Sequence, residues 1–181
     1  MLKKVCKIIG LWSFLLYAPL GWSQTIYIKP DEALKQVFKN SEKVSRESKQ
    51  INPERKRALE KKLGTALKKT TWNFYIAKTG NTVDGYALLD QELGKTEPIT
   101  VMTAIFPNGE VQEVEILVYR EPIGSEVHEK SFLKQYKGKK ITDPIRLNQD
   151  IIPISGATIS SRSVSQAVKR ALIIWSEFYG K

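Results

Sequence analysis

Ile154-Ser155-Gly156-Ala157-Thr158-Ile159-Ser160-Ser161 stands directly before a long segment with apolar residues at helical spacing, which closes the chain. Gly156 allows a bend of the backbone that a side chain would obstruct. Ser160 or Ser161 is suited to be the N-cap of the helix that follows. We therefore expect Thr158 to lie in the loop before that helix, where the free N–H groups of the helix start offer a site for a phosphate.

The closing helix is expected over residues 161–179, with Gly180 as its stop. Arg162 lies close enough in sequence to pair with an anion held at Thr158. The buried stripe of this helix is predicted to be Val164, Ala167, Val168, Ala171, Leu172 and Trp175.

The middle of the chain changes to an apolar period of two, which is typical of strands. Strands are predicted over residues 72–77, 83–89, 98–106 and 111–119. Asn108-Gly109 predicts a hairpin with a two-residue loop between the last two strands. The fold class that follows is α+β: an antiparallel strand meander with one buried face, packed by N-terminal helices and a long C-terminal helix.

Residues 1–23 have the features of a signal peptide, with early lysines, a short apolar run and small residues at its end. Cleavage would leave a mature chain without cysteine, because Cys6 is the single cysteine. Such a chain has no disulfide, no thiol nucleophile and no cysteine-ligated metal. We expect an exported, periplasmic protein. The alternative is a retained membrane anchor, which would make the protein membrane-associated.

Residues 24–70 carry 13 basic and 6 acidic residues, whereas residues 71–181 carry 13 of each. Helical stripes are predicted from Asp31 to Gln50 and from Asn52, as N-cap, to Leu67. The expected organisation is a signal peptide (1–23), a basic helical N-terminal segment (24–70) and a domain over 71–181. The charged helix surface is a solvated face, a docking face for an acidic redox partner or a contact for anionic lipids. Nucleic acid is not expected as a partner of an exported protein.

Several separated motifs resemble the FMN-binding domain family, which includes flavin-carrying members of the sodium-pumping NADH:quinone oxidoreductase and of Rnf complexes. The motifs are Ser155-Gly156-Ala157-Thr158 with Ser160-Ser161, then Gly94-Lys95 with Pro98-Ile99, Phe132 to Lys139, and the loop from Tyr119 to Gly124. The resemblance implies that a flavin transferase joins FMN through its phosphate to the Thr158 hydroxyl. The cofactor-binding residues that it implies are Thr158, Ser155, Gly156, Ala157, Ser160, Ser161, Tyr119, Glu121, Pro122 and Gly124.

Two positions depart from the family pattern. Ile152 stands where many members have an acidic residue, which bears on recognition by the transferase. Ile123 is inserted between Pro122 and the glycine of the loop that the resemblance places near the flavin ring. Pro122 and Gly124 would equally serve a plain strand-exit turn.

The resulting functional prediction is an electron-transfer flavoprotein, or a redox subunit of a membrane electron-transport complex, in which FMN handles the electrons. Its donor and acceptor proteins are not specified by the sequence. No catalytic residue and no metal ligand set is expected, and His128 is predicted to be an exposed loop residue. The alternative is a ligand-binding or interaction subunit without a redox role.

Overall fold

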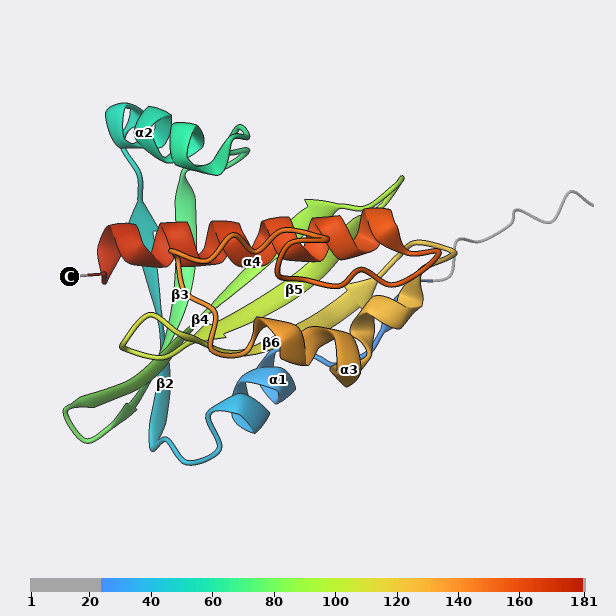
Figure 1. Ribbon diagram of the computed structural model, residues 1–181. Helices are drawn as coiled ribbons and strands as arrows, with labels where there is room; N and C mark the ends of the chain where they lie inside the picture. Colours follow the sequence, from blue (N-terminus) through green and yellow to red (C-terminus); the bar gives the residue numbers. More distant parts are fainter. Residues whose placement is uncertain (1–23, 181) are drawn as a thin grey trace, which may run out of the picture.

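The computed structural model describes residues 24–180. The predicted signal peptide lies outside the described residues. The architecture is α+β, as predicted: an antiparallel six-stranded sheet in the order β1-β6-β5-β4-β3-β2, with the long helix α4 across one face (Figure 1). The strands are β1 (Thr25–Ile26), β2 (Lys43–Gln50), β3 (Thr71–Thr79), β4 (Thr82–Leu93), β5 (Pro98–Ile105) and β6 (Val111–Tyr119). The helices are α1 (Pro30–Val37), α2 (Pro53–Leu63), α3 (Lys130–Leu133) and α4 (Thr158–Phe178), with 3₁₀ turns at η1 (Ser125–His128) and η2 (Lys134–Tyr136).

The predicted meander is formed by β3 to β6, and its last hairpin has a longer loop than expected. The Phe106 N–H donates to the Glu110 carbonyl at 2.8 Å, and the Gly109 N–H donates to the Phe106 carbonyl at 2.9 Å. These bonds close a loop of three residues rather than two. Gly109 is required here, because its φ of 85° is left-handed and an added Cβ would lie 2.9 Å from the Trp175 ring.

The helix predicted from Asp31 to Gln50 is wrong beyond Val37. Residues 43–50 form β2, which pairs along its whole length with β3, from Lys43 opposite Lys78 to Gln50 opposite Thr71. This segment has no buried residue and little apolar periodicity, so backbone pairing with β3 decides its conformation rather than side-chain pattern.

The second predicted helix is confirmed as α2, although it ends at Leu63 and does not continue to Leu67 as predicted. The Asn52 side chain accepts a hydrogen bond from the Arg55 N–H at 2.8 Å, so it is the N-cap that the sequence indicated. Gly64 ends the helix with a φ of 72°.

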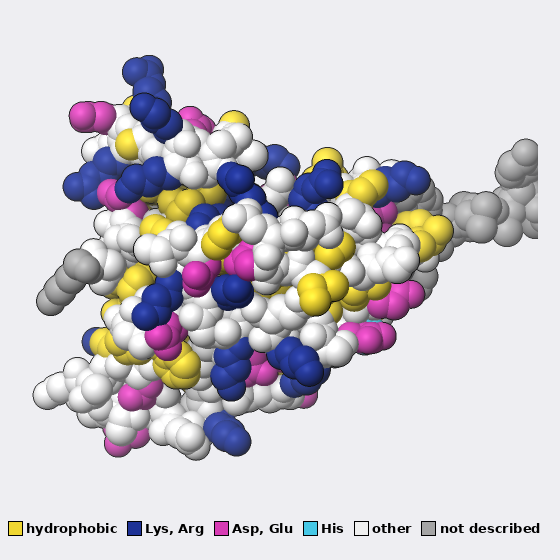
Figure 2. Space-filling model, viewed as in Figure 1, with side chains coloured by type: hydrophobic (Ala, Val, Ile, Leu, Met, Phe, Trp, Pro, Cys, Tyr) yellow, Lys and Arg dark blue, Asp and Glu magenta, His cyan; other side chains and the backbone are white. Residues whose placement is uncertain are grey.

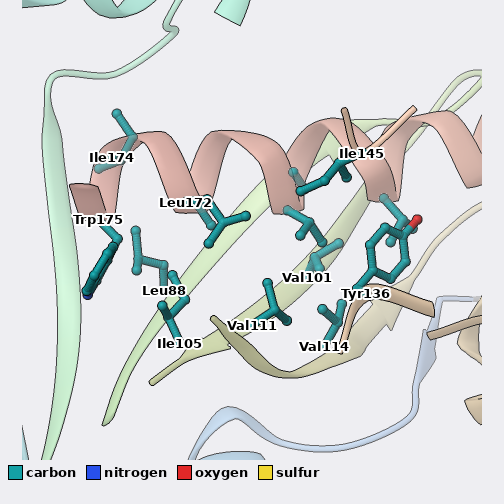
Figure 3. Packing of buried hydrophobic residues seen from close by; sticks show 14 of the residues in the cluster. Leu88, Val101, Ile105, Val111, Val114, Tyr136, Ile145, Leu172, Ile174 and Trp175 are labelled. Carbon is teal, nitrogen blue, oxygen red and sulfur yellow. The ribbon is translucent and has the colours of Figure 1, made fainter. Parts of the chain in front are cut away.

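Both faces of the sheet are covered, whereas the sequence predicted one buried face. The main core lies under α4, where Leu172 and Trp175 point toward the strands (Figure 3). A smaller core on the other face packs Leu34 and Phe38 of the α1 region against β-strand residues such as Met102 and Leu117. Strands with apolar residues at nearly every position, such as β5, are accounted for by this double coverage.

β3 and β4 are not paired beyond Phe74 and Leu88, and side chains of α4 bond to that part of β4. β3 pairs with β4 only as far as Phe74 opposite Leu88. Beyond that point Arg170 donates to the Gln91 carbonyl at 3.3 Å, and the Ser163 hydroxyl donates to the Leu93 carbonyl at 2.7 Å. These bonds hold α4, from its second turn to just past its middle, against the end of β4 and so place the start of the helix.

Within residues 24–180, no helix is both long and apolar enough to span a membrane.

Candidate functional site

Helix α4 begins at Thr158, three residues earlier than predicted. Ala157 is therefore the N-cap, and Ser160 and Ser161 lie inside the first turn. The capping prediction is wrong because the Ser161 hydroxyl is used otherwise: it donates to the Ala157 carbonyl at 2.9 Å and accepts from the Ile154 N–H at 3.2 Å. The serine thus ties the approaching loop to the helix.

The start of α4 presents unpaired hydrogen-bond donors. Ala157 offers no side-chain acceptor, and the first intrahelical bond is donated by the Ser161 N–H to the Ala157 carbonyl at 2.8 Å. The N–H groups of Thr158, Ile159 and Ser160 therefore have no acceptor among the described residues. No acidic side chain lies in this turn, and Thr158 is exposed. Free amide donors with the positive end of a 21-residue helix attract an anion.

The loop after β6 packs against this helix start. The Tyr119 hydroxyl lies 2.9 Å from the Ser160 hydroxyl and donates to the Ile123 carbonyl at 2.6 Å. Gly124 has a φ of 89°, and an added Cβ would lie 3.2 Å from Ala157 Cβ and 2.9 Å from the Tyr119 hydroxyl. Two segments of the predicted site, far apart in sequence, are therefore in contact.

Glu121 holds the turn between β4 and β5. Its carboxylate accepts from the Thr96 N–H at 2.6 Å, the Thr96 hydroxyl at 2.9 Å and the Glu97 N–H at 3.0 Å. Burial raises the pKa of Glu121, but the donors on Glu97 and Thr96 outweigh it and keep the pKa below its ordinary value. Gly94 makes this contact possible, because an added Cβ would lie 2.4 Å from a Glu121 oxygen.

Residues 94–173 match the family model described as "FMN-binding domain". Over these residues the chain resembles the FMN-binding family. The match begins at Gly94, the residue that contacts Glu121, and extends along α4 as far as Ile173. It therefore includes both segments that meet at the helix start.

The chain is similar to one curated protein, a member of the "Proton-translocating ferredoxin:NAD(+) oxidoreductase complex" of Clostridium ljungdahlii. The two are 29% identical over 116 residues, which cover 60% of this chain and 62% of that protein. The chain thus spans less than two thirds of this relative.

Two solved structures have a similar fold. The first is Shewanella oneidensis NqrC, with a TM-score of 0.57 at 16% identity over 82% of this chain and 87% of that one. The second belongs to the Na(+)-translocating NADH-quinone reductase of Parabacteroides distasonis, with a TM-score of 0.54 at 14% identity over 86% and 87% of the two chains. These likenesses confirm the fold predicted from sequence.

The start of α4 has an apolar side. Leu93, Ile123 and Ile159 are 49%, 76% and 47% exposed, which is high for large apolar residues. They are neighbours, since Ser163 bonds to the carbonyls of both Leu93 and Ile159, and Ile123 is tied through Tyr119 to Ser160. Figure 2 shows hydrophobic side chains exposed at this end of the molecule.

The other side of the helix start is cationic. Arg162 is exposed and lies one turn after Thr158, on the same helix face. The other residues predicted to bind the cofactor differ in exposure. Ser155, Gly156 and Pro122 are exposed, whereas Ala157, Ser160 and Ser161 are buried and hold the loop in place.

The residues present fit FMN. Free amide groups suit the phosphate, the Thr158 hydroxyl is accessible beside them, and the exposed apolar side chains suit a flat aromatic ring. Among the described residues no cluster of side chains could hold a metal ion. His128 is exposed, as predicted, and stacks on Tyr27 at 4.1 Å between ring centroids.

The sequence did not identify Leu93, Ile159 or Thr96 as residues of the site. Their signal was weak, since isolated apolar or hydroxyl residues at strand and helix ends are common. Gly94 and Glu121 belong to two of the family motifs in the sequence, and the fold brings these motifs into contact. This pair was the signal in the sequence that pointed to the turn containing Thr96.

Proposed function

We propose that this protein is an electron-transfer flavoprotein whose FMN is joined through its phosphate to Thr158. The start of α4 carries the proposal: an exposed threonine hydroxyl beside three N–H groups without an acceptor in the described part of the chain. The relatives named above belong to electron-transport complexes, which supports a redox role for this chain as well.

The phosphate end is held by the backbone of α4. An ester of FMN with a hydroxyl retains one negative charge on the phosphate, and the N–H groups of Thr158, Ile159 and Ser160 supply donors for its oxygens. Arg162, one turn later, adds a positive charge on the same face. The buried bonds of Ser161 and Tyr119 keep this turn in one conformation.

The apolar side of the helix start is the proposed binding surface for the isoalloxazine ring of FMN. FMN when bound supplies one- and two-electron transfer through its isoalloxazine ring. Leu93, Ile123 and Ile159 would cover apolar ring surface and exclude water from it. A covalent link suits an exported protein, in which a lost cofactor is not easily replaced.

The partners are proposed to be a flavin transferase for maturation and the donor and acceptor proteins of a membrane electron-transport complex. We propose export to the periplasm on the signal-peptide pattern of residues 1–23. Tyr119, Glu121, Gly124 and the Ser155–Ser161 loop are proposed to build the cofactor site, with Glu121 acting through the Thr96 turn.

The test is an intact-mass measurement on protein exported from cells that carry the flavin transferase. The wild type should gain the mass of FMN less one water, and Thr158→Ala should not. Thr142→Ala is a matched control, because Thr142 is also exposed but lies near Trp175 and Tyr179, at the other end of α4. No mass increase and no yellow colour in the wild type would leave a non-redox interaction subunit as the better account.

A further inference from the structure

A cleft with a volume of about 800 Å³ lies on the outer side of α4, between the end of α2 and the segment 142–149. It is lined by four basic residues, and Asp143 is its acidic residue. Lys62 comes from α2, Arg146 from the segment 142–149, and Arg162 and Lys169 from α4. Three separate parts of the chain therefore bring positive charge to one concavity.

Lys169 stabilises the wall of the cleft. Its ammonium group donates to the carbonyls of Ile141 and Asp143 and so fastens the segment to α4. Asp150 fixes the other part of the segment, because its carboxylate accepts from the N–H groups of Ile145 at 3.1 Å and Arg146 at 2.8 Å. The cleft is thus preformed, and Arg146 stands on a fixed backbone.

The other basic residues of the cleft have no acidic partner in the described part of the chain. Lys62, Arg146 and Arg162 are exposed, and none of them takes part in an ion pair there. We call the part of the cleft that these three residues line the cationic cleft. The positive surface continues along α2 through Arg57 and Lys61, and Figure 2 shows the gathering of Lys and Arg side chains there.

The cationic cleft is separate from the surface that suits the flavin ring. Arg162 follows Thr158 by one turn, so the cleft opens next to the proposed attachment point. Leu93, Ile123 and Ile159 lie around the other side of the same turn, toward β4 and the loop after β6. A molecule in the cleft would therefore lie beside the cofactor without displacing it.

We propose that the cationic cleft docks an acidic segment of the protein that exchanges electrons with the flavin, an inference that rests on the proposed function. A concave site with charges on three walls matches a protruding acidic segment better than a flat bilayer. The Arg146 guanidinium, which the proposed phosphate site does not use, suits carboxylates, since guanidinium groups bind them in a bidentate manner. Lipid binding by α2 lacks an apolar contribution, since Leu59 is buried and Leu63 is half-buried against the core.

The test compares two pairs of charge reversals. Lys62→Glu with Arg146→Glu alters the cleft and leaves Arg162 and the attachment loop intact. Lys39→Glu with Lys43→Glu is the matched control, because both lysines are exposed and lie before and at the start of β2, the end away from α2. Urea unfolding verifies that each double variant is as stable as the wild type.

The first probe is a fluorescent oligoglutamate peptide, followed by fluorescence anisotropy at low ionic strength. The cleft variant should bind it about tenfold more weakly or worse, whereas the control should stay within about twofold of the wild type. An equal loss of peptide affinity in both variants would show that only the net charge of the protein matters, and it would overturn the proposal. So would unchanged peptide binding with loss of binding to phosphatidylcholine vesicles containing phosphatidylglycerol, which would indicate a lipid surface.

The second probe separates this proposal from the proposed function. FMN content is measured in every sample, and the reduction of FMN-loaded protein by reduced ferredoxin, a small acidic electron donor, is followed by stopped-flow absorbance. The cleft variant should show a lower rate and a weaker dependence on salt, at unchanged FMN content. Unchanged rates would overturn the docking role. A wild type without FMN would instead contradict the proposed function, while the peptide experiment still decides whether the cleft binds acidic segments.

Discussion

The hydroxyl of Tyr119 lies 2.9 Å from the hydroxyl of Ser160, at the contact between the end of β6 and the first turn of α4. The same Tyr119 hydroxyl donates to the Ile123 carbonyl at 2.6 Å. One buried phenol therefore joins the strand, the loop after it and the helix that begins with Thr158. Burial raises the pKa of Tyr119, so the phenol stays protonated and remains a donor.

Tyr119→Phe is expected to lower the free energy of unfolding by about 1–3 kcal/mol, because the Ile123 carbonyl and the Ser160 hydroxyl lose their partner. It should also lower the yield of FMN attachment, since the helix start is less well fixed. Tyr75→Phe is the control, as Tyr75 is only half-buried and its hydroxyl has no bond in the described structure. Urea unfolding and intact mass measure the two effects. Equal stability losses in both variants would contradict the role of this contact.

Gly94→Ala should disturb the turn between β4 and β5, because the new Cβ would lie 2.4 Å from a Glu121 oxygen and 3.0 Å from the Glu97 carbonyl oxygen. A loss of about 1–3 kcal/mol in unfolding free energy is expected. Glu121→Ala alone should also destabilise, but the double variant should lose less than the sum, since the clash disappears with the carboxylate. A double-mutant cycle by urea unfolding measures this coupling. Strict additivity would show that the two residues do not interact.

Acid pH should weaken the same turn through Glu121. Its pKa is below the ordinary value in the folded protein, so its contribution to stability is fully present above the unfolded pKa, about 4.3. The contribution is lost as the pH falls through the lower folded pKa. Wild type should therefore lose more stability than Glu121→Gln between neutral pH and about pH 3. Urea midpoints at both pH values test this difference, and parallel losses in the two proteins would refute it.

The sequence predicted the features that depend on local chemistry. The N-cap Asn52, the strands β3 to β6 and the final helix follow from capping and periodicity. The resemblance drew attention to the stretch around Thr158, because its motif is continuous, although the helix was expected to begin only at Ser161.

The features that depend on tertiary contacts were not predictable in this way. Residues 43–50 carry no strand signal of their own and extend only because β3 offers them a partner. The helix start moved from Ser161 to Thr158 because the Ser161 hydroxyl bonds to Ile154 and Ala157. The cationic cleft is formed by segments that are distant in sequence, so no single stretch of sequence predicts it.

Arg170 is a buried cation on which two carboxylates depend. It is 9% exposed, donates to Asp90 at 2.6 Å and also bonds to Glu92. Arg170→Met would leave Glu92 without this partner and Asp90 with the half-exposed Lys69 alone, at a cost of about 3–5 kcal/mol. Lys49→Met is the control, because its pair with Glu47 is solvent-exposed and contributes about 1 kcal/mol or less. Thermal and urea unfolding should show a large loss for the first variant only.

Replacing the exposed isoleucines tests where the flavin ring lies. Ile123→Ser and Ile159→Ser should change the stability of the FMN-free protein by about 0.5 kcal/mol or less, because both side chains are largely in water already. In FMN-loaded protein the same changes should open the ring to solvent, so iodide should quench flavin fluorescence more strongly than in the wild type. Val44→Ser is the matched control, since Val44 is also exposed but lies on β2, at the opposite edge of the sheet from β1 and β6. Quenching that is the same in all four proteins would place the ring elsewhere, and the cationic side of the helix start would then have to be reconsidered as its surface.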